Sequence, residues 1–151
     1  MLSVNIEDLP NYIGQEVGKS EWMAIDQDRI NLFADAIDDH QWIHVDSEKA
    51  KKELPTKKTI AHGFLTLSLM TPLSFKIWEI KGANQIINYG LNKVRFLNMV
   101  PSGSRVRLAL KIKDVKPLEK GGQKIIGIAT MEIEGERRSA YIAEFIAAAF
   151  P

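Results

Sequence analysis

The chain of 151 residues contains no cysteine. Disulfide bonds, thiolate metal sites and a cysteine nucleophile are therefore excluded. The lack of disulfides is compatible with a reducing compartment, where they are rare. A charge imbalance is missing too, because 20 basic and 19 acidic residues give a net charge of +1. The chain thus lacks the basic surface that is typical of proteins that bind nucleic acids or anionic membranes.

Long apolar runs are also missing. The longest, residues 64–70, is far shorter than the about 20 residues needed to cross a bilayer. The first fourteen residues include Asn5, Glu7 and Asp8, so they contain no apolar core of a secretory signal. We therefore expect a cytoplasmic enzyme or binding protein that associates with neither membranes nor nucleic acids.

The composition that remains is ordinary for a globular protein, with 45% hydrophobic and 26% charged residues. A chain of this kind is too apolar and too evenly charged for intrinsic disorder. Its length suits one domain with one core, and no repeat or linker divides it. We expect a single domain over residues 1–151.

Helical signals are concentrated in the first half of the chain. After a lead-in with turn residues up to Gly18 and a first strand over residues 21–25, Asp26 is expected to cap a helix. This helix should end near Asp38 and Asp39. The apolar residues that it would place on one face, at helical spacing, are Ile30, Phe33, Ala36 and Ile37.

Two further segments follow before the midpoint. Residues 41–45 are expected to be irregular or extended, and Ser47 is expected to cap a charged helix that stops at Pro55. Residues 59–75 carry apolar side chains on nearly all faces, which indicates a helix inside the fold. A buried strand is the alternative for so short an apolar run, but the small and polar residues within it favour the helix.

The second half shows the two-residue period of strands. Between Arg105 and Lys113 apolar residues alternate with basic ones, as in a half-exposed strand, and Gly121-Gly122 predicts a hairpin turn. Helices that come early and strands that come late predict an α+β fold, with a mostly antiparallel sheet and a helix buried against it. The other expected strands are residues 85–97 (one strand or two, loosened at Gly90), 126–133 and 141–150.

All three histidines lie between positions 40 and 62, beside several aspartates. Asp39 closes the first predicted helix and His44 follows after a turn, so a carboxylate and an imidazole can converge on one small volume. Such a pair is suited to moving a proton to or from water near neutral pH. The alternative is structural, with turn chemistry for Asp39 and a hydrogen-bonded core position for His44.

Gly63 opens the helix that is predicted to be buried. The first N–H groups of a helix have no partner within it and lie at the positive end of its dipole. A glycine at this position lets another group approach closely. The backbone at Gly63 is therefore a candidate oxyanion site, and together with the acid–base pair it provides what enolate chemistry on an acyl thioester requires.

Two segments resemble the signature of the MaoC-like dehydratases and (R)-specific enoyl-CoA hydratases, a family with the hot-dog fold. That signature runs Gly-Asp-x-Asn-Pro-(Ile/Leu)-His and continues downstream with (Ala/Val)-His-Gly and an apolar helix. The resemblance spans about residues 12–150, and residues 39–46 and 88–96 are similar to the NodN-like branch, named for a nodulation protein. The matching segments are Asp39-His40-Gln41-Trp42-Ile43-His44-Val45-Asp46 and Ala61-His62-Gly63-Phe64-Leu65.

The chain departs from this signature at three positions. Asp38 replaces the motif glycine, which predicts an aspartate in an unusual backbone conformation. Gln41 and Trp42 replace Asn-Pro, and the bulky Trp42 is expected to narrow or cap the acyl tunnel. These departures bear on substrate choice and on hydratase activity itself.

The resemblance implies a hot-dog fold in which an antiparallel sheet wraps around a central buried helix. It implies stereospecific addition of water to a trans-2-enoyl thioester, carried by coenzyme A or an acyl carrier protein, to give an (R)-3-hydroxyacyl thioester. Asp39 and His44 would hold the water, and the Gly63 N–H would hold the carbonyl oxygen. No metal or organic cofactor and a homodimer are also implied. The residues expected to bind substrate are Trp42, His62, Phe64, Tyr89 and Asn92.

Other interpretations stay open at this point. A thioesterase of the same fold usually has a lone carboxylate on the central helix, and residues 64–70 contain none. A non-catalytic acyl-thioester binding protein is the third class. His62 is expected to fix its loop through a hydrogen bond more than to react. A metal site of Asp39, His40, His44 and Asp46 is disfavoured because no glutamate follows His40. The cations expected either to meet coenzyme A phosphates or to be solvated are Lys57, Lys58, Lys93 and Arg95.

Overall fold

An antiparallel sheet forms most of the molecule in this computed structural model, which describes all residues 1–151. The strands follow the order β2-β6-β7-β8-β5, and β3 pairs with β6 beside β2. Along β6 and β7 buried residues alternate with less buried ones, as the two-residue period of the sequence predicts. The strands of this sheet are β2 (Glu16–Lys19), β3 (Met23–Ile25), β5 (Gln85–Phe96), β6 (Ser104–Pro117), β7 (Gln123–Ile133) and β8 (Tyr141–Phe150).

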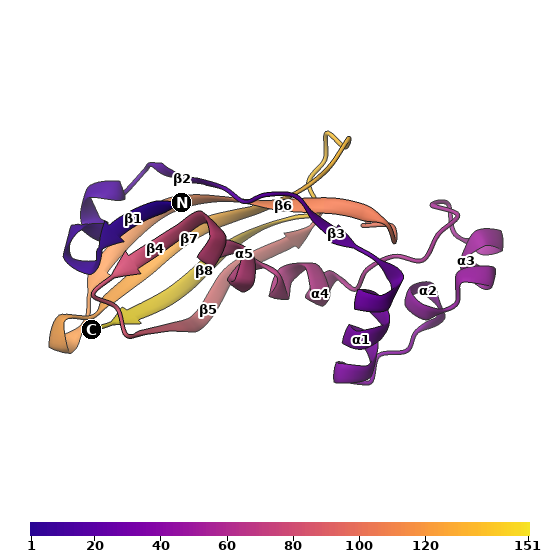
Figure 1. Cartoon of the computed structure of the whole chain (residues 1–151), viewed down its shortest axis with the longest axis horizontal. Helices are drawn as coiled ribbons and strands as arrows, with labels where there is room; N and C mark the ends of the chain where they lie inside the picture. The colour runs from indigo at the N-terminus through magenta and orange to yellow at the C-terminus, as the bar shows by residue number, and fades with distance from the viewer.

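Two consecutive helices, α4 (Gly63–Ser68) and α5 (Met70–Ile77), lie against one face of the sheet (Figure 1). Both helices direct one apolar stripe into the core that they share with the inner faces of the strands. The predicted α+β fold with a helix against an antiparallel sheet is confirmed. The helical residues in this core are Leu65, Leu69, Leu73 and Ile77.

The expectation that this helix is buried on nearly all faces is wrong for the single chain. Phe64 is 66% exposed and Phe75 is 52% exposed, so the side that faces away from the sheet is open. The helix is also divided at Leu69, which joins α4 to α5. The apolar residues on the open side are therefore not explained by packing within one chain.

The first eighteen residues contain more structure than the expected lead-in. Strand β1 (Leu2–Asn5) pairs in parallel with β4 (Trp78–Lys81), which follows α5 directly. Between β1 and β2 the 3-10 helix η1 (Ile6–Tyr12) buries Leu9 completely. The turn residues visible in the sequence lie in these connections. The parallel pairing of β1 could not be predicted from local sequence, because its partner strand lies 76 residues away.

Three helices, α1 (Gln27–Ile37), α2 (Trp42–Val45) and α3 (Ser47–Glu53), lie beyond one end of the sheet, away from both termini (Figure 1). As predicted, Asp26 caps α1, because its carboxylate accepts a hydrogen bond from the Arg29 N–H. The cap of α3 is Asp46 and not Ser47, since the Asp46 carboxylate accepts from the Lys49 N–H. None of the helices is long and apolar enough to cross a membrane.

The expectation that residues 41–45 are irregular or extended is also wrong, because they form the single helical turn α2. The His44 N–H donates to the Gln41 carbonyl and the Asp46 N–H donates to the Trp42 carbonyl, at 2.9 Å each. The β-branched residues Ile43 and Val45 favour extended backbone. Burial of the His44 side chain overrides that preference.

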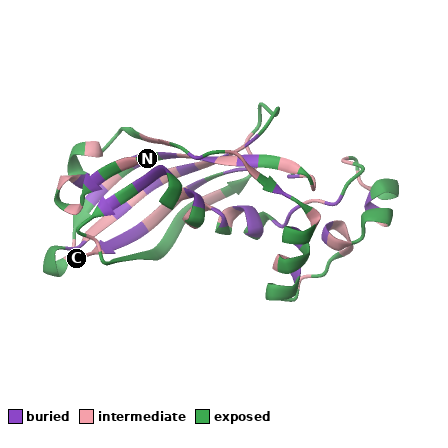
Figure 2. Ribbon diagram, viewed as in Figure 1, coloured by how far each residue is buried: buried purple, intermediate pink, exposed green.

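Strand β5 is one edge of the sheet and pairs only with β8. It is a single strand whose pairing register shifts between Asn88 and Gly90 and again between Leu91 and Lys93, on either side of the loosening expected at Gly90. Figure 2 shows it exposed along almost its whole length. Its exposed side chains include Ile87 and Tyr89. A long, apolar and unpaired edge is unusual for an isolated sheet, because it readily pairs with another strand.

The packing of α5 on the sheet gives a test of the core. We expect Leu73→Ala to lower the free energy of unfolding by about 2–5 kcal/mol, because Leu73 is 1% exposed and its loss leaves a cavity. Lys76→Ala, an exposed change on the same helix, should alter it by less than about 0.5 kcal/mol. Urea unfolding followed by circular dichroism measures both, and equal losses would contradict this packing.

Candidate active site

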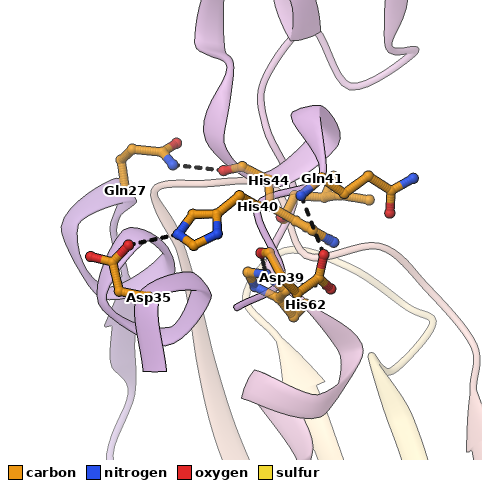
Figure 3. Close-up of polar contacts among 8 residues, drawn as sticks. Gln27, Asp35, Asp39, His40, Gln41, His44 and His62 are labelled. Atoms are coloured by element: carbon orange, nitrogen blue, oxygen red, sulfur yellow. Dashed lines mark hydrogen bonds and ion pairs between the residues drawn. The ribbon is translucent and has the colours of Figure 1, made fainter. Parts of the chain in front are cut away.

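The turn after α1 places the first candidate residue, Asp39. Asp38 ends the helix in the left-handed conformation, with φ 57° and ψ 28°, which confirms the unusual backbone expected where the motif has glycine. The Asp39 N–H then donates to the Ala34 carbonyl at 3.1 Å. The Asp39 carboxylate accepts from the Gln41 N–H at 3.2 Å and stays about half exposed (Figure 3). The carboxylate is thus oriented by backbone groups while remaining open to solvent.

His44 projects from α2 into the interior and is 6% exposed. Its Nδ1 lies 2.6 Å from the Ile60 carbonyl oxygen. A carbonyl only accepts hydrogen bonds, so Nδ1 carries the proton and Nε2 of the neutral ring is left with a free lone pair. The backbone of this turn is fixed from α1, because the Gln27 side-chain amide donates to the His44 carbonyl at 2.7 Å (Figure 3).

The surroundings of His44 favour its neutral form. Burial lowers the pKa of the imidazole below its ordinary value. The bond to Ile60 and the Asp39 carboxylate raise this pKa, whereas the adjacent His62 lowers it, and the lowering prevails. At neutral pH the free Nε2 can therefore accept a proton.

His62 connects the two candidate residues. Its ring stacks on that of His44, with centroids 3.8 Å apart and planes inclined by 22°. Its ring also contacts that of Phe33 of α1 in a tilted arrangement, with centroids 5.2 Å apart. Its Nε2–H donates to the Asp39 backbone carbonyl at 3.0 Å, whereas its buried Nδ1 has no partner. This is the loop-fixing hydrogen bond expected from the sequence, made to the residue that bears the candidate carboxylate.

Gly63 is the first residue of α4, as predicted, and His62 precedes it as the N-cap. No group of the chain accepts a hydrogen bond from the Gly63 N–H. A Cβ atom at this position would lie only 3.0 Å from the ring of Phe96. A side chain here would have to displace the Phe96 ring, so the close approach of β5 favours glycine, and the Gly63 N–H is free for a ligand.

A pocket of about 450 Å³ opens beside these residues. His44 and Gly63 line it together with Phe96, the last residue of β5, and residues 97–100 that follow it. The residue with the free imidazole nitrogen and the residue with the free backbone N–H thus border one cavity. The other lining residues that matter below are Phe96, Asn98 and Arg138.

Comparison with known proteins identifies the family. A model described as a MaoC-like domain matches residues 8–134. The chain belongs to the MaoC-like family. Proteins similar to this MaoC-like chain include a 3-hydroxyacyl-thioester dehydratase Z of Mycobacterium tuberculosis, 46% identical over 94% of this chain and 93% of the other. Nodulation protein N of Rhizobium leguminosarum bv. viciae is 44% identical over 97% and 91%.

Solved structures confirm the hot-dog fold of this MaoC-like protein. An (R)-hydratase from A. caviae has a TM-score of 0.73 at 19% identity, covering 92% of this chain and 96% of that one. A MaoC-like dehydratase from Rhodospirillum rubrum has a TM-score of 0.72 at 18% identity, covering 91% and 92%. At such identities the agreement concerns the fold. The resemblance to the NodN-like branch rests on the nodulation protein named above.

Not all of the predicted substrate-binding residues meet in this MaoC-like site. His62 lies within it, and Phe64 packs edge-on against Phe96 with ring centroids 6.1 Å apart. Trp42 instead lies under the Lys49 ammonium, 4.5 Å from its ring centre, and does not line the pocket. The remaining two are exposed on β5, where Asn92 donates to Glu144 and Tyr89 borders a separate groove against α4 and α5.

The residues proposed for an alternative metal site do not converge. His40 pairs with Asp35 at the surface, at 2.7 Å, and Asp46 caps α3. The set that does come together is Asp39, His44 and His62, with one ligand-type atom of each within 4.8 Å of the others.

Some residues of the site gave no signal in the sequence. Gln27 fixes the His44 backbone from α1, and Arg138 reaches the pocket from the loop between β7 and β8. Neither belongs to the recognised motifs. Phe96 lies at the end of a segment that resembles the NodN-like branch, but its contact with Gly63 depends on the pairing of distant strands.

The lowered pKa of His44 predicts how stability depends on pH. In the unfolded chain the pKa of His44 is about 6.5. Between this pH and the lower pKa of the native ring, the unfolded chain binds a proton that the native protein does not, so the free energy of unfolding rises with pH in this range. The contribution of His44 to the free energy of unfolding should therefore be fully present above the unfolded pKa and decline as the pH falls towards the lower pKa of the native ring. His44→Asn should remove this part of the decline in urea unfolding at pH 7.5, 6.5 and 5.5.

Titration of the His44 ring by NMR in the unaltered protein provides an independent measurement. Equal pH slopes for the variant and the unaltered protein, together with a ring pKa at or above its ordinary value, would contradict the buried neutral imidazole.

Proposed function

We propose that this MaoC-like protein is a hydratase and dehydratase that interconverts trans-2-enoyl and (R)-3-hydroxyacyl thioesters. The observation that carries the proposal is that His44 and Gly63 line one pocket, while an oxygen of the Asp39 carboxylate lies within 4.8 Å of a His44 ring nitrogen. A relative that shares 46% of its residues over nearly the full length bears the name 3-hydroxyacyl-thioester dehydratase Z, which supports the same reaction here.

The acid–base pair is proposed to hold the reacting water between the Asp39 carboxylate and His44 Nε2. The hydrogen bond from Nδ1 to Ile60 and the lowered pKa both leave Nε2 unprotonated. His44 is therefore the better candidate for the base. Asp39 accepts the second hydrogen of the water and so orients its oxygen.

The Gly63 N–H is proposed to bind the carbonyl oxygen of the thioester. Charge develops on that oxygen when a nucleophile adds to the β-carbon, because the electrons of the double bond move into the enolate. A free N–H at the start of a helix stabilises this charge more than that of the ground-state carbonyl. Removal of one such donor typically lowers the rate about 10²- to 10³-fold.

The proposed step balances without a cofactor. The water oxygen bonds to the β-carbon while its proton moves to His44 Nε2, and the π bond becomes an enolate held at Gly63. The protonated Nε2 then returns the proton to the α-carbon on the same face. One C–O and one C–H bond have formed, and the π bond of the alkene and one O–H bond of the water have been broken. Dehydration is the same sequence reversed.

The pair is tested by loss of enoyl-thioester absorbance on addition of protein to crotonyl-CoA and to longer 2-enoyl-CoAs. Asp39→Asn and His44→Ala should each reduce turnover about 10²- to 10⁴-fold, because each removes a group that handles the water. His40→Ala is the matched control, since His40 lies in the same segment but pairs with Asp35 away from the pocket. Its activity should be unchanged.

Folded protein without turnover on any chain length would exclude the hydratase. Release of free thiol from acyl-CoA would then favour the thioesterase, and tight binding without either reaction would favour a binding protein. Chiral analysis of the 3-hydroxyacyl product decides the stereochemistry.

We further propose that the protein is a homodimer and that β5 forms part of the contact. The edge strand exposes Ile87, Tyr89 and Leu91, and the neighbouring helices expose Phe64 and Phe75. Asn88 of β5 donates to Thr71 of α5 at 3.2 Å, so the open sides of the strand and the helix adjoin. Pairing with a second copy would cover both, because an unpaired edge offers free backbone groups and the helices offer apolar area.

A charge on this edge tests the dimer. Ile87→Lys should shift the mass measured by analytical ultracentrifugation from dimer to monomer, since a desolvated ammonium disfavours the contact. Lys124 lies on β7, away from the β5 edge, so Lys124→Ala should leave the mass unchanged. A monomeric unaltered protein, or a dimer that tolerates Ile87→Lys, would contradict this interface.

A further inference from the structure

One cationic side chain borders the pocket that contains His44 and Gly63. It belongs to Arg138, in the loop between β7 and β8. No carboxylate is among the residues that line this pocket, and its histidine is held neutral. Arg138 therefore contributes the only charge among the residues that line this pocket, and the Asp39 carboxylate lies near His44 outside that lining.

Arg138 differs from the arginines on the adjoining strands. Arg105 forms a two-pronged ion pair with Glu134, and Arg107 pairs with Glu132 at 2.6 Å. The guanidinium of Arg138 has no carboxylate within ion-pair distance and no hydrogen bond within the chain. A guanidinium left free beside a pocket is available to an anionic ligand.

The backbone at Arg138 is nevertheless fixed. Its carbonyl accepts a hydrogen bond from the Asn98 side chain at 3.3 Å, and Asn98 also lines the pocket. The Leu97 N–H donates to the Ala140 carbonyl at 2.8 Å, which attaches the end of the loop to the same wall. The neighbouring Arg137 borders a different pocket, together with Glu132 and Glu136. Two adjacent arginines thus face different surroundings.

We propose that Arg138 binds the phosphate attached to the pantetheine arm of the thioester substrate. This inference rests on the proposed function, which brings a thioester into this pocket. Coenzyme A and acyl carrier proteins both carry a phosphate at the far end of that arm, outside the reacting group. A guanidinium matches the oxygens of a phosphate with two parallel hydrogen bonds.

This assignment differs from the sequence-based candidates for phosphate binding. Lys93 and Arg95 border a separate pocket on the other side of the sheet edge, with Ile142 and Glu144. That pocket does not include His44 or Gly63. Within one chain, Arg138 is the cation that shares a cavity with the candidate reacting groups.

The test measures binding of unreactive butyryl thioesters by isothermal titration calorimetry. Butyryl-pantetheine has no phosphate, butyryl-phosphopantetheine has the one shared by both carriers, and butyryl-CoA has the remaining phosphates as well. Arg138→Ala should raise the Kd of both phosphate-bearing ligands about 10- to 100-fold, the range for a hydrogen bond between charged groups, and leave that of butyryl-pantetheine unchanged. Arg137→Ala should change none of the three.

The outcomes separate this inference from the proposed function. Equal weakening of all three ligands by Arg138→Ala, or no weakening of any, would overturn the role of Arg138. An effect confined to butyryl-CoA would place the guanidinium on a phosphate that acyl carrier proteins lack and would overturn the shared site. Because the ligands have no double bond, Arg138 is tested even if no hydration is found. In kinetics with crotonyl-CoA, the same variant should raise KM and leave kcat unchanged.

Discussion

The packing of α4 and α5 against the antiparallel sheet is the contact on which the rest of the structure depends. Four apolar side chains, one per turn, hold the two helices to the inner face of the strands. That contact places Gly63 where Phe96 of β5 packs closely over it, at a distance that favours glycine. The start of α4 is thereby fixed beside the pocket, with its first N–H free. The site is thus a consequence of how the core packs.

A second constraint acts across the short segments beyond the sheet. The His62 ring stacks on that of His44, contacts Phe33 at a tilt and donates to the Asp39 carbonyl. One side chain therefore holds the turn that carries the carboxylate and the ring that carries the free nitrogen. The Ile60 carbonyl selects the tautomer of His44, and burial keeps this ring neutral. Rigid support of this kind is what a proton-transfer pair requires, because small errors in position slow the reaction strongly.

The sides of α4, α5 and β5 that face away from the core leave apolar surface and a strand edge uncovered in a single chain. The buried stripe of α4 and α5 is satisfied by the sheet, whereas Phe64 and Phe75 on the other side meet solvent. Strand β5 leaves its backbone groups unpaired along the edge. A second copy that covers both would also enclose the groove bordered by Tyr89. The exposed positions of Tyr89 and Asn92, which do not reach the pocket of their own chain, are compatible with a role at such a contact.

Much of this could be predicted from the sequence alone. The two-residue period of β6 and β7, the Asp26 cap and the glycine that opens α4 are local signals, and each was confirmed because neighbouring residues decide it. The left-handed Asp38 followed from the family motif for the same reason. Asp39, His44 and Gly63 could be named as candidates because their spacing lies within one short stretch.

Only the tertiary structure decided the rest. The turn α2 forms because burial of His44 overrides the extended preference of its β-branched neighbours. The parallel pair of β1 and β4, the stack of His62 on His44 and the approach of Arg138 to the pocket join residues far apart in the chain. No local pattern encodes such contacts, since they arise when the sheet closes over the helices. The sequence determined which groups are available for chemistry, and the packing determined which of them meet.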